Sequence, residues 1–251
     1  MRHIQLTIEY DGTHFNGWQI QSPHHRTVQA TIETALQTIF KKKIRCIGSG
    51  RTDSGVHAWG QVAHFKTPSR LTTDEITRAL NAHLPKDIVI RDVRERPNTF
   101  HAQFNAKRKT YRYIILNRDT PSALERNGVW HIPQNLNLRR MRQAARFLMG
   151  KKDFRAFMAA DPAARRAGKV KNTVRTLYRL DIKRRKDHIC IEMEADGFLY
   201  KMVRNIVGTL VEIGRGKYPG EYMREILIHK DRHLAGKTAP AQGLFLMQVR
   251  Y

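Results

Sequence analysis

Cysteine is almost absent from this sequence, which holds only Cys46 and Cys190 among its 251 residues. Two cysteines exclude a disulfide framework and a zinc site built from thiolates. No apolar run reaches the roughly 18 residues that a membrane-spanning helix needs, and residues 1–7 lack the apolar block of a signal peptide. We therefore expect a soluble, cytoplasmic protein with one large domain or two closely packed halves.

Acidic residues are also scarce, with 22 Asp and Glu against 46 Lys and Arg, so the formal net charge is +24. The cations are spread in clusters along the whole chain, at 41–43, 139–140, 151–152, 165–166 and 183–186. A basic surface of this kind attracts a polyanion, which makes nucleic acid the expected partner. A membrane surface is disfavoured, because no segment joins a basic face to a strongly apolar one.

Hydrophobic periodicity predicts an α+β fold of two halves with a largely antiparallel sheet. In the first half we expect strands near 3–10, 44–49, 60–66 and 87–93 and helices at 27–40 and 73–83. Thr27 is the expected N-cap of the first helix, and Thr73 precedes two acidic residues at the start of the second. The order β-α-β-β-α-β is that of a ferredoxin-like unit.

The second half is similar in kind. We expect strands near 99–105, 109–117, 173–184, 188–195 and 244–250, and helices at 137–149, at 198–213 and after Pro219. The strands at 173–195 are predicted to form a hairpin, and residues 159–172 are predicted to form a mobile basic loop. The halves are expected to meet near 96–108, which gives predicted domains of residues 1–97 and 98–251.

Asp53 is the first candidate for chemistry, in the segment Gly50-Arg51-Thr52-Asp53-Ser54-Gly55-Val56-His57-Ala58. Glycines on either side permit a tight loop, and Arg51 favours the ionised carboxylate, which could act as a nucleophile. A turn aspartate that bonds its own backbone is the alternative. An aspartic protease is a further alternative, but it needs a second Asp-Thr/Ser-Gly, which this sequence lacks.

Arg204 is the second candidate, within the almost wholly apolar segment 198–208. A guanidinium in such a place needs a carboxylate or a phosphate, because an unpaired buried charge is costly. A structural ion pair, or a side chain that extends to the surface, is equally compatible with the sequence. Lys201 lies one helical turn earlier, and Gly208 would let another backbone approach closely.

Tyr111 and Tyr113 alternate with cations in Lys107-Arg108-Lys109-Thr110-Tyr111-Arg112-Tyr113. In a strand this pattern places both tyrosines on one face and most of the cations on the other. Aromatic rings interleaved with cations suit unstacked bases, which stack on the rings while their phosphates meet Lys and Arg. Core tyrosines in a strand with a solvated basic face are the equally common alternative.

Histidine provides no complete metal motif. His229 and His233 are four residues apart, but a third ligand is missing. We therefore expect both to be surface residues rather than parts of a metal site.

Five motifs, taken in order, resemble those of the TruA-type tRNA pseudouridine synthases. They are Tyr10-Asp11-Gly12-Thr13 with Gly17-Trp18-Gln19; the segment from Gly50 to Ala58; Phe100-His101-Ala102 leading to Lys109-Thr110-Tyr111-Arg112-Tyr113; Met202-Val203-Arg204-Asn205; and Ala239-Pro240 with Gly243-Leu244. The resemblance runs from the first expected strand to the last. Five motifs in the same order do not arise by chance.

By this resemblance the protein would be an isomerase that converts uridine to pseudouridine at tRNA positions 38–40, on the 3′ side of the anticodon stem-loop. Asp53 would be the nucleophile, attacking C1′ of the sugar or C6 of the base. Tyr111 would stack on the target base, and Arg204 would pair with Asp53 and keep it ionised. Arg51 would help to displace the target nucleotide, and Lys201 would contact the substrate.

The resemblance also implies a fold of two ferredoxin-like halves that form a central, largely antiparallel sheet with helices on its flanks and a basic active-site cleft. A homodimer that acts on tRNA without a metal or an organic cofactor is expected. Two residues depart from the family pattern, since Gln103 replaces the usual arginine and Lys152 a common histidine, both outside the catalytic set. A non-catalytic tRNA-binding protein or RNA chaperone on the same scaffold is the alternative.

Overall fold

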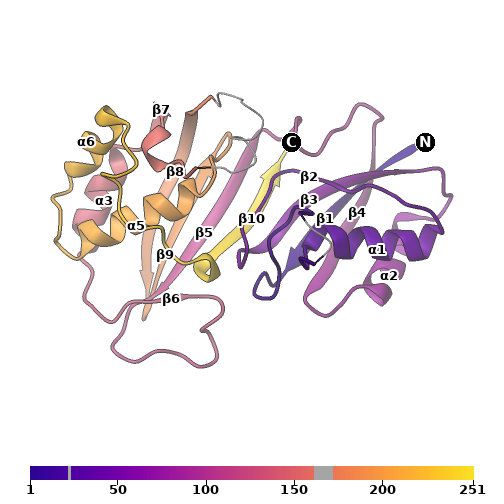
Figure 1. Cartoon of the computed structure of the whole chain (residues 1–251), viewed down its shortest axis with the longest axis horizontal. Coiled ribbons are helices and arrows are strands. Elements are labelled where there is room, and N and C mark those ends of the chain that lie inside the picture. The colour runs from indigo at the N-terminus through magenta and orange to yellow at the C-terminus, as the bar shows by residue number, and fades with distance from the viewer. Residues whose placement is uncertain (22–23, 161–171) are drawn as a thin grey trace. The chain divides into compact units, whose positions relative to one another are not determined.

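The computed structural model describes residues 1–21, 24–160 and 172–251, which divide into two compact units (Figure 1). The first unit contains Met1–Lys107 together with Phe245–Tyr251, and the second contains Arg108–Leu244. The division follows residue 107, later than the boundary at residue 97 expected from the sequence. The described residues form five α-helices and mixed, mostly antiparallel strand pairs.

The first unit is built around β1 (Arg2–Tyr10), whose Ile4, Leu6 and Ile8 are fully buried. β3 (His57–Thr67) and β4 (Ile88–Arg96) pair with β1 on either side, both antiparallel. Alternation of apolar residues predicted all three strands, although β3 begins earlier and β4 ends later than expected. The element order β-α-β-β-α-β expected for this half is present.

On the edge away from β1, β3 pairs with two further strands, over two residues in each case. β2 is reduced to Ile47–Gly48, within the strand expected at 44–49, and it pairs antiparallel with β3. β10 (Leu244–Arg250) pairs in parallel with the first two residues of β3. The last strand, expected in the second half, therefore belongs to the first unit.

Two helices complete the first unit, and they pack against each other (Figure 1). α1 (Val28–Phe40) begins after Thr27, whose hydroxyl accepts the Ala30 N–H at 3.3 Å, so the expected N-cap is confirmed. Its buried face includes Val28, Ile32 and Leu36, spaced at three to four residues as a helix requires. α2 (Thr73–His83) has the bounds that the sequence predicted.

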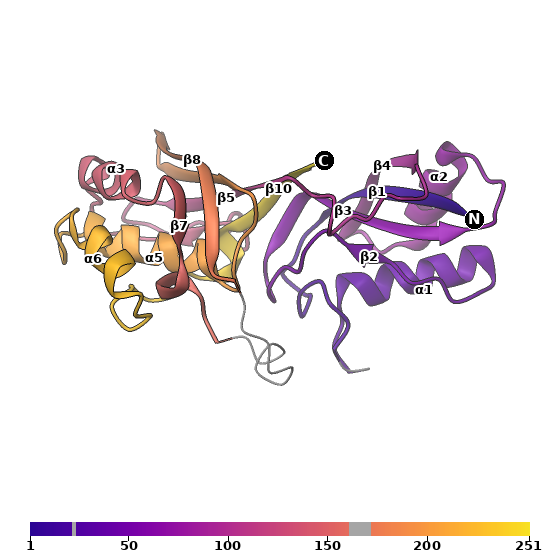
Figure 2. The same ribbon diagram turned by 90° about the horizontal axis from the view of Figure 1, so that it is seen from above.

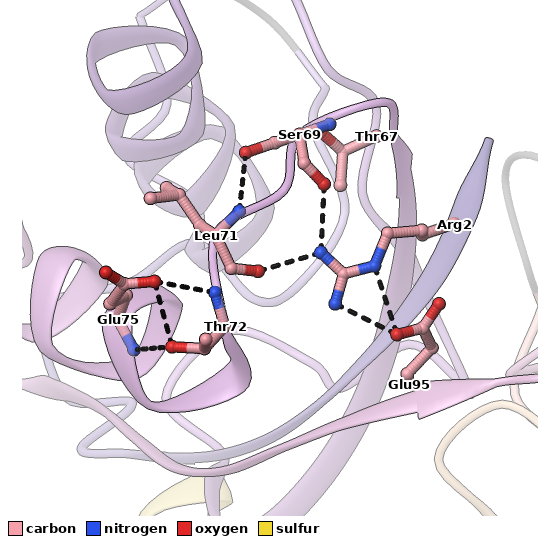
Figure 3. A network of polar contacts seen from close by, with 7 residues as sticks. All are labelled: Arg2, Thr67, Ser69, Leu71, Thr72, Glu75 and Glu95. Atoms are coloured by element: carbon pink, nitrogen blue, oxygen red, sulfur yellow. Dashed lines mark hydrogen bonds and ion pairs between the residues drawn. The ribbon is translucent and has the colours of Figure 1, made fainter.

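Thr72 caps α2 through a reciprocal pair of bonds (Figure 3). The Glu75 N–H donates to the Thr72 hydroxyl at 3.2 Å, and the Glu75 carboxylate accepts the Thr72 N–H at 2.7 Å. The chain before this cap is held by Arg2 of β1, whose guanidinium donates to the carbonyls of Ser69 and Leu71 at 2.9 and 2.7 Å. The cap and this clamp together fix where the helix starts relative to the sheet.

The prediction of a strand near 99–105 is wrong, because this segment forms turns. The Ala102 N–H donates to Nδ1 of His64 on β3 at 3.2 Å, and the next two N–H groups point at Nδ1 of His101 at 3.2 and 3.3 Å. Imidazole acceptors thus satisfy the donors that a strand would offer to a neighbouring strand.

The second unit is a four-stranded antiparallel arrangement in the order β5-β9-β8-β7. Its strands are β5 (Arg108–Leu116), β9 (His188–Ala195), β8 (Val174–Arg185) and β7 (Gly150–Asp153), and the two-residue β6 (Trp130–His131) pairs in parallel with β5. The predicted hairpin is present between β8 and β9. β6 and β7 are too short to give a periodic signal in the sequence.

Three helices lie on one face of the β7–β8–β9 strands (Figure 2). α3 (Leu138–Arg146) packs on α5 (Met202–Gly214), and α6 (Tyr222–His229) contacts α3. Two short 3₁₀ helices, η1 (Arg155–Phe157) and η2 (Ala241–Gly243), are the remaining elements of the described residues. α5 is buried along most of its length, as its apolar composition predicts.

α5 begins at Met202 rather than at Phe198 as expected. Lys201, just before it, has a left-handed backbone with a φ of 58°, which a helix cannot include. Most of the basic loop expected at 159–172 lies outside the described residues. Of the helices in the described ranges, none is long and apolar enough to cross a membrane.

Replacing Thr72 with alanine should lower the free energy of unfolding by about 1 kcal/mol, because it removes the capping box of α2. Thr73→Ala, one residue later, keeps the box and should not lower it. Urea unfolding of both variants measures the difference. Equal losses of stability would show that the Thr72 side chain does not cap the helix.

His64 should make the protein less stable in mild acid. Burial, with His101, His3 and Lys66 nearby, lowers the pKa of His64 from 6.5 to about 4. Between these values the unfolded chain binds a proton that the folded chain rejects, so stability falls as the pH falls through this window. From pH 7 to about 4.5, wild type should lose roughly 2 kcal/mol more than His64→Gln.

Urea unfolding across this pH range measures the effect, with His83→Gln at the exposed end of α2 as the control for loss of an imidazole. The control should follow the wild-type curve. Wild type and His64→Gln with parallel pH dependence would contradict the lowered pKa.

Candidate active site

Asp53 lies in the loop that joins β2 to β3, residues 49–56, which we call the Asp53 loop. It packs against residues 11–18, the supporting segment, which follows β1. Two backbone hydrogen bonds join them, from the Trp18 N–H to the Thr52 carbonyl at 3.1 Å and from the Gly55 N–H to the Phe15 carbonyl at 3.3 Å. The first two sequence motifs therefore form one structural element.

Two glycines of the supporting segment bring its backbone into direct contact with the Asp53 loop. A Cβ on Gly17 would lie 2.6 Å from the Thr52 carbonyl oxygen, and the φ of Gly17 is +88°. A Cβ on Gly12 would lie 2.1 Å from the Val56 carbonyl oxygen. Neither position can hold a side chain unless the loop moves, so both glycines are needed to place Asp53.

Buried side chains hold the loop from the opposite direction. The Tyr10 and Thr52 hydroxyls are 2.8 Å apart, and burial raises the pKa of Tyr10, so it remains a neutral phenol. The amide of Gln61, which is fully buried, accepts the Ser49 hydroxyl at 2.8 Å and donates to the Gly50 carbonyl at 3.0 Å. The Asp53 loop is thus held by a polar network, and Asp53 itself is half-buried.

Arg51 lies on the same loop with an exposed side chain. It makes no hydrogen bond or ion pair within residues 1–21, 24–160 and 172–251. Since nothing in this part of the chain neutralises it, its charge is directed to solvent and to any approaching polyanion.

A further polar pair beside the loop was not singled out from the sequence. Asp11 Oδ1 lies 3.1 Å from His57 Nδ1, which also faces the Gly12 N–H at 3.0 Å. Burial alone would raise the pKa of Asp11, but hydrogen bonds from Thr13 and the nearby His57 and His14 together lower the pKa. Both residues belong to the first two motifs, so their proximity follows from the contact between those motifs.

Tyr111 lies on β5 in the second unit, with its ring edge-on to Phe198 at a centroid distance of 5.1 Å. It is 8% exposed, whereas Tyr113 on the same face is fully buried and donates its hydroxyl to the Pro240 carbonyl at 2.7 Å. Arg108 and Arg112, on the opposite face, pair with glutamates of β9. The predicted separation of rings and cations is confirmed, and Tyr113 is a core residue.

Arg204 lies in the first turn of α5 and is half-buried. Its Nε donates to the Ala239 carbonyl at 2.8 Å, and the Ala239 N–H returns a bond to the Arg204 carbonyl at 3.1 Å. The amide oxygen of Asn205 accepts the Thr238 hydroxyl at 2.6 Å, which holds the segment before Ala239 against α5. The fourth and fifth motifs therefore pack together to orient one guanidinium.

The surroundings of α5 account for two further sequence expectations. A Cβ on Gly208 would lie 1.7 Å from the Lys237 carbonyl oxygen, so the close approach expected there is confirmed. Lys201, at the N-terminal end of α5, places its Nζ 5.2 Å from the centroid of the Tyr200 ring. Its left-handed backbone turns the chain into the helix next to Arg204.

Lys109 is a candidate that the sequence analysis missed. It lies on β5 two residues before Tyr111, so its side chain is on the same face as the tyrosine ring. Burial, and to a smaller extent the charge of Arg175, lowers the pKa of Lys109 to about 8. The alternation of the strand could have identified it, because Lys109 is at an odd-numbered position like Tyr111 and Tyr113 and so lies on their face.

The candidate residues thus fall into two groups. Asp53 and Arg51 share a loop of the first unit, whereas Tyr111, Arg204 and Lys201 belong to the second. The expectation that His229 and His233 are surface residues is confirmed, because both are exposed. No cluster of three or more His, Cys, Asp or Glu side chains that could hold a metal ion occurs in the ranges that the structure describes.

A family model and several curated proteins are similar to this chain over most or all of its length. A family model described as tRNA pseudouridine synthase matches residues 6–105 and 144–251. A protein named tRNA pseudouridine synthase A 2 from Clostridium perfringens (strain 13 / Type A) is 47% identical over 251 residues, 100% of each chain.

Two further relatives are named tRNA pseudouridine synthase A. That of Ruminiclostridium cellulolyticum is 46% identical over 252 residues, and that of Thermoanaerobacter sp. (strain X514) is 44% identical over 251 residues, in both cases covering 100% of each chain. The region aligned with these relatives therefore spans the positions of all five motifs.

Gly17→Ala should destabilise the protein and loosen the Asp53 loop, because it adds a Cβ where backbone atoms are already in contact. Gly150→Ala is a matched control, since Gly150 has a similar φ of +84° but nothing within 4 Å of its Cβ position. Both variants should lose about 1 kcal/mol from backbone strain, and Gly17→Ala roughly 1–3 kcal/mol more from crowding.

Urea unfolding measures the stabilities, and amide hydrogen exchange at residues 52–54 reports the loop. Exchange should accelerate only in Gly17→Ala. Equal losses in the two variants, with unchanged exchange, would show that the contact at Gly17 does not hold the loop.

Proposed function

The chain belongs to the tRNA pseudouridine synthase family and is an isomerase that acts on uridine in tRNA, and we propose that Asp53 is the nucleophile of this reaction. The seating of the Asp53 loop is the observation that supports this most directly, because Gly12 and Gly17 press the supporting segment against its backbone. A reacting group needs such rigid neighbours to be held near its productive position.

The reaction breaks the bond between N1 of uracil and C1′ of the ribose and forms a bond between C5 and C1′. In the proposed mechanism the Asp53 carboxylate attacks the nucleoside, at C1′ of the sugar or C6 of the base, and forms a covalent intermediate. The base then turns and rejoins the sugar through C5, which releases the carboxylate. The hydrogen lost from C5 is balanced by the hydrogen gained at N1.

A stacked base has to leave its helix before this chemistry can occur, at a cost of a few kcal/mol. We assign Arg51 to displacing the nucleotide, since its exposed guanidinium is carried on the loop of the nucleophile. Tyr111 stacks on the extruded uracil, and its edge-on contact with Phe198 holds the ring in place. Phosphate contacts elsewhere offset the cost of extrusion.

The proposed site requires the two units to act together, with Arg204 pairing with Asp53 across a basic cleft. The two bonds between Arg204 and Ala239 orient the guanidinium for such a partner. Lys201 and Lys109 add positive charge beside Arg204 and Tyr111 and are assigned to phosphates next to the target. Both lysines belong to the second unit, which also carries Arg204 and the Tyr111 ring. In this proposal the same unit therefore binds the target base and the phosphates beside it.

We propose that the target uridines lie on the 3′ side of the anticodon stem-loop and that the enzyme acts in the cytoplasm as a homodimer. The full-length likeness to relatives named as tRNA pseudouridine synthases supports tRNA as the substrate in this proposal. The expectation of chemistry without a metal or an organic cofactor is part of the same proposal. The formal net charge of +24 favours binding to a folded RNA that offers many phosphates.

Asp53→Asn should abolish pseudouridine formation while tRNA binding persists. Removing the nucleophile should slow the reaction at least about a thousandfold, because the neutral amide does not attack. Nucleotide-resolution mapping of pseudouridine on unmodified tRNA transcripts measures the product, and filter binding measures affinity. New pseudouridine should be confined to the 3′ side of the anticodon stem-loop.

Asp92→Asn is the control, since it removes another carboxylate of the first unit, one paired with Arg94 on β4. It should retain full activity. Wild-type modification by Asp53→Asn would refute the role of Asp53, and pseudouridine mapped only outside the anticodon stem-loop would refute the substrate site.

A further inference from the structure

A cavity of about 620 Å³ lies in the second unit, at the end of α3, beside β7 and against α6. We call it the α6 cavity. Its volume is in the range of sites that take small organic groups. None of the residues assigned to the isomerase reaction lines it.

The lining of the α6 cavity is strongly cationic. Asp153 is its one carboxylate, and it pairs with Lys230 at 3.2 Å, so these two charges offset each other. Arg146, Lys152 and Arg224 contribute three further positive charges to the lining. None of the three has a carboxylate partner in the described part of the chain, so the cavity keeps a net charge of about +3 and favours an anion.

The rest of the lining is apolar. Phe147 and Leu227 are half-buried, and Ile228 is 62% exposed although it is a large aliphatic residue on a helix. A bare phosphate would use the cations and leave these groups in water. A ligand that joins an anionic group to a flat or apolar one would use both, and a nucleotide is such a ligand.

The α6 cavity is separate from the place where the target base is bound. β7 and β5 are the two edges of the four-stranded arrangement, with β8 and β9 between them. Three strand spacings amount to roughly 14 Å, and the cavity lies beyond β7 while Tyr111 lies on β5. The cavity and Tyr111 therefore lie at opposite edges of these four strands (Figure 1).

We propose that the α6 cavity binds a second nucleotide of the tRNA, remote from the target uridine. Its phosphate meets Arg146, Lys152 and Arg224, and its sugar or base lies against the surface of Leu227 and Ile228. The proposal rests on tRNA being the substrate, and it adds a contact that places the RNA without taking part in the reaction. Lys152 then stands at an RNA contact, which gives its departure from the family pattern a physical meaning.

A second copy of this chain is a poorer occupant. A two-fold interface presents the same patch on both sides, so a patch of about +3 would face its own charge. An acidic protein would match the charge, but the polyanion already known to this enzyme is tRNA. Charge complementarity therefore favours RNA.

The test compares the double variant Arg146→Gln/Arg224→Gln with the charge-matched control Arg139→Gln/Lys183→Gln, whose exposed side chains lie outside the cavity. The cavity variant should raise KM for tRNA roughly tenfold beyond the control and reduce the salt slope of binding by about 1 to 2. Its single-turnover rate at saturating tRNA should equal that of wild type. Thermal unfolding verifies that both variants are folded.

A photo-crosslinker attached at Ile228→Cys, with the cations intact, identifies the occupant directly. Crosslinks to a tRNA nucleotide more than two positions from the modified uridine, together with the KM effect, support the proposal. Crosslinks to a second protein chain or to the target region, no RNA crosslink, or a KM equal to that of the control would each overturn it. A reduced single-turnover rate would also overturn it, whereas failure of the assignment of Asp53 is seen separately in Asp53→Asn.

Discussion

Direct backbone contact between the supporting segment and the Asp53 loop is the constraint on which the candidate site depends. Gly12 and Gly17 leave no room for a Cβ, so the loop is fixed by main-chain atoms that cannot change rotamer. Tyr10 and Gln61 satisfy the polar groups on its other side. Because other groups fix the loop, the position of a half-buried carboxylate on it does not depend on contacts that the carboxylate itself makes. The proposed role as a nucleophile requires such a preorganised position.

In the second unit, backbone contacts orient a cationic side chain in a similar way. Arg204 is oriented by bonds to the backbone of Ala239, and that backbone is held by Asn205 one residue along the same helix. Glycine again permits the contact, since Gly208 lies under the Lys237 carbonyl. In both units, motifs distant in sequence pack together because each one supplies the space or the hydrogen bond that another needs.

Much of this could be predicted from the sequence where a local rule dominates. Thr27 as a cap, the alternation around Tyr111 and the close approach at Gly208 follow from side-chain chemistry at one position, and each is confirmed. The segment 99–105 could not be predicted in this way, because histidine acceptors on β3 and in the turn itself replaced strand pairing. The α6 cavity was also invisible, since its cations come from three elements that only the fold brings together. The roles of Asp53, Arg204 and Tyr111 stay predictions.

The placement of β10 has a consequence for how the chain is made. Residues 245–251 complete the first unit, and Phe245 stacks on His57 at 4.7 Å, beside the end of the Asp53 loop. All of the second unit separates them from the rest of their own unit. The first unit, most of which leaves the ribosome first, is therefore completed only after the whole second unit has been synthesised, and until then His57, beside the end of the Asp53 loop, lacks its contact with Phe245.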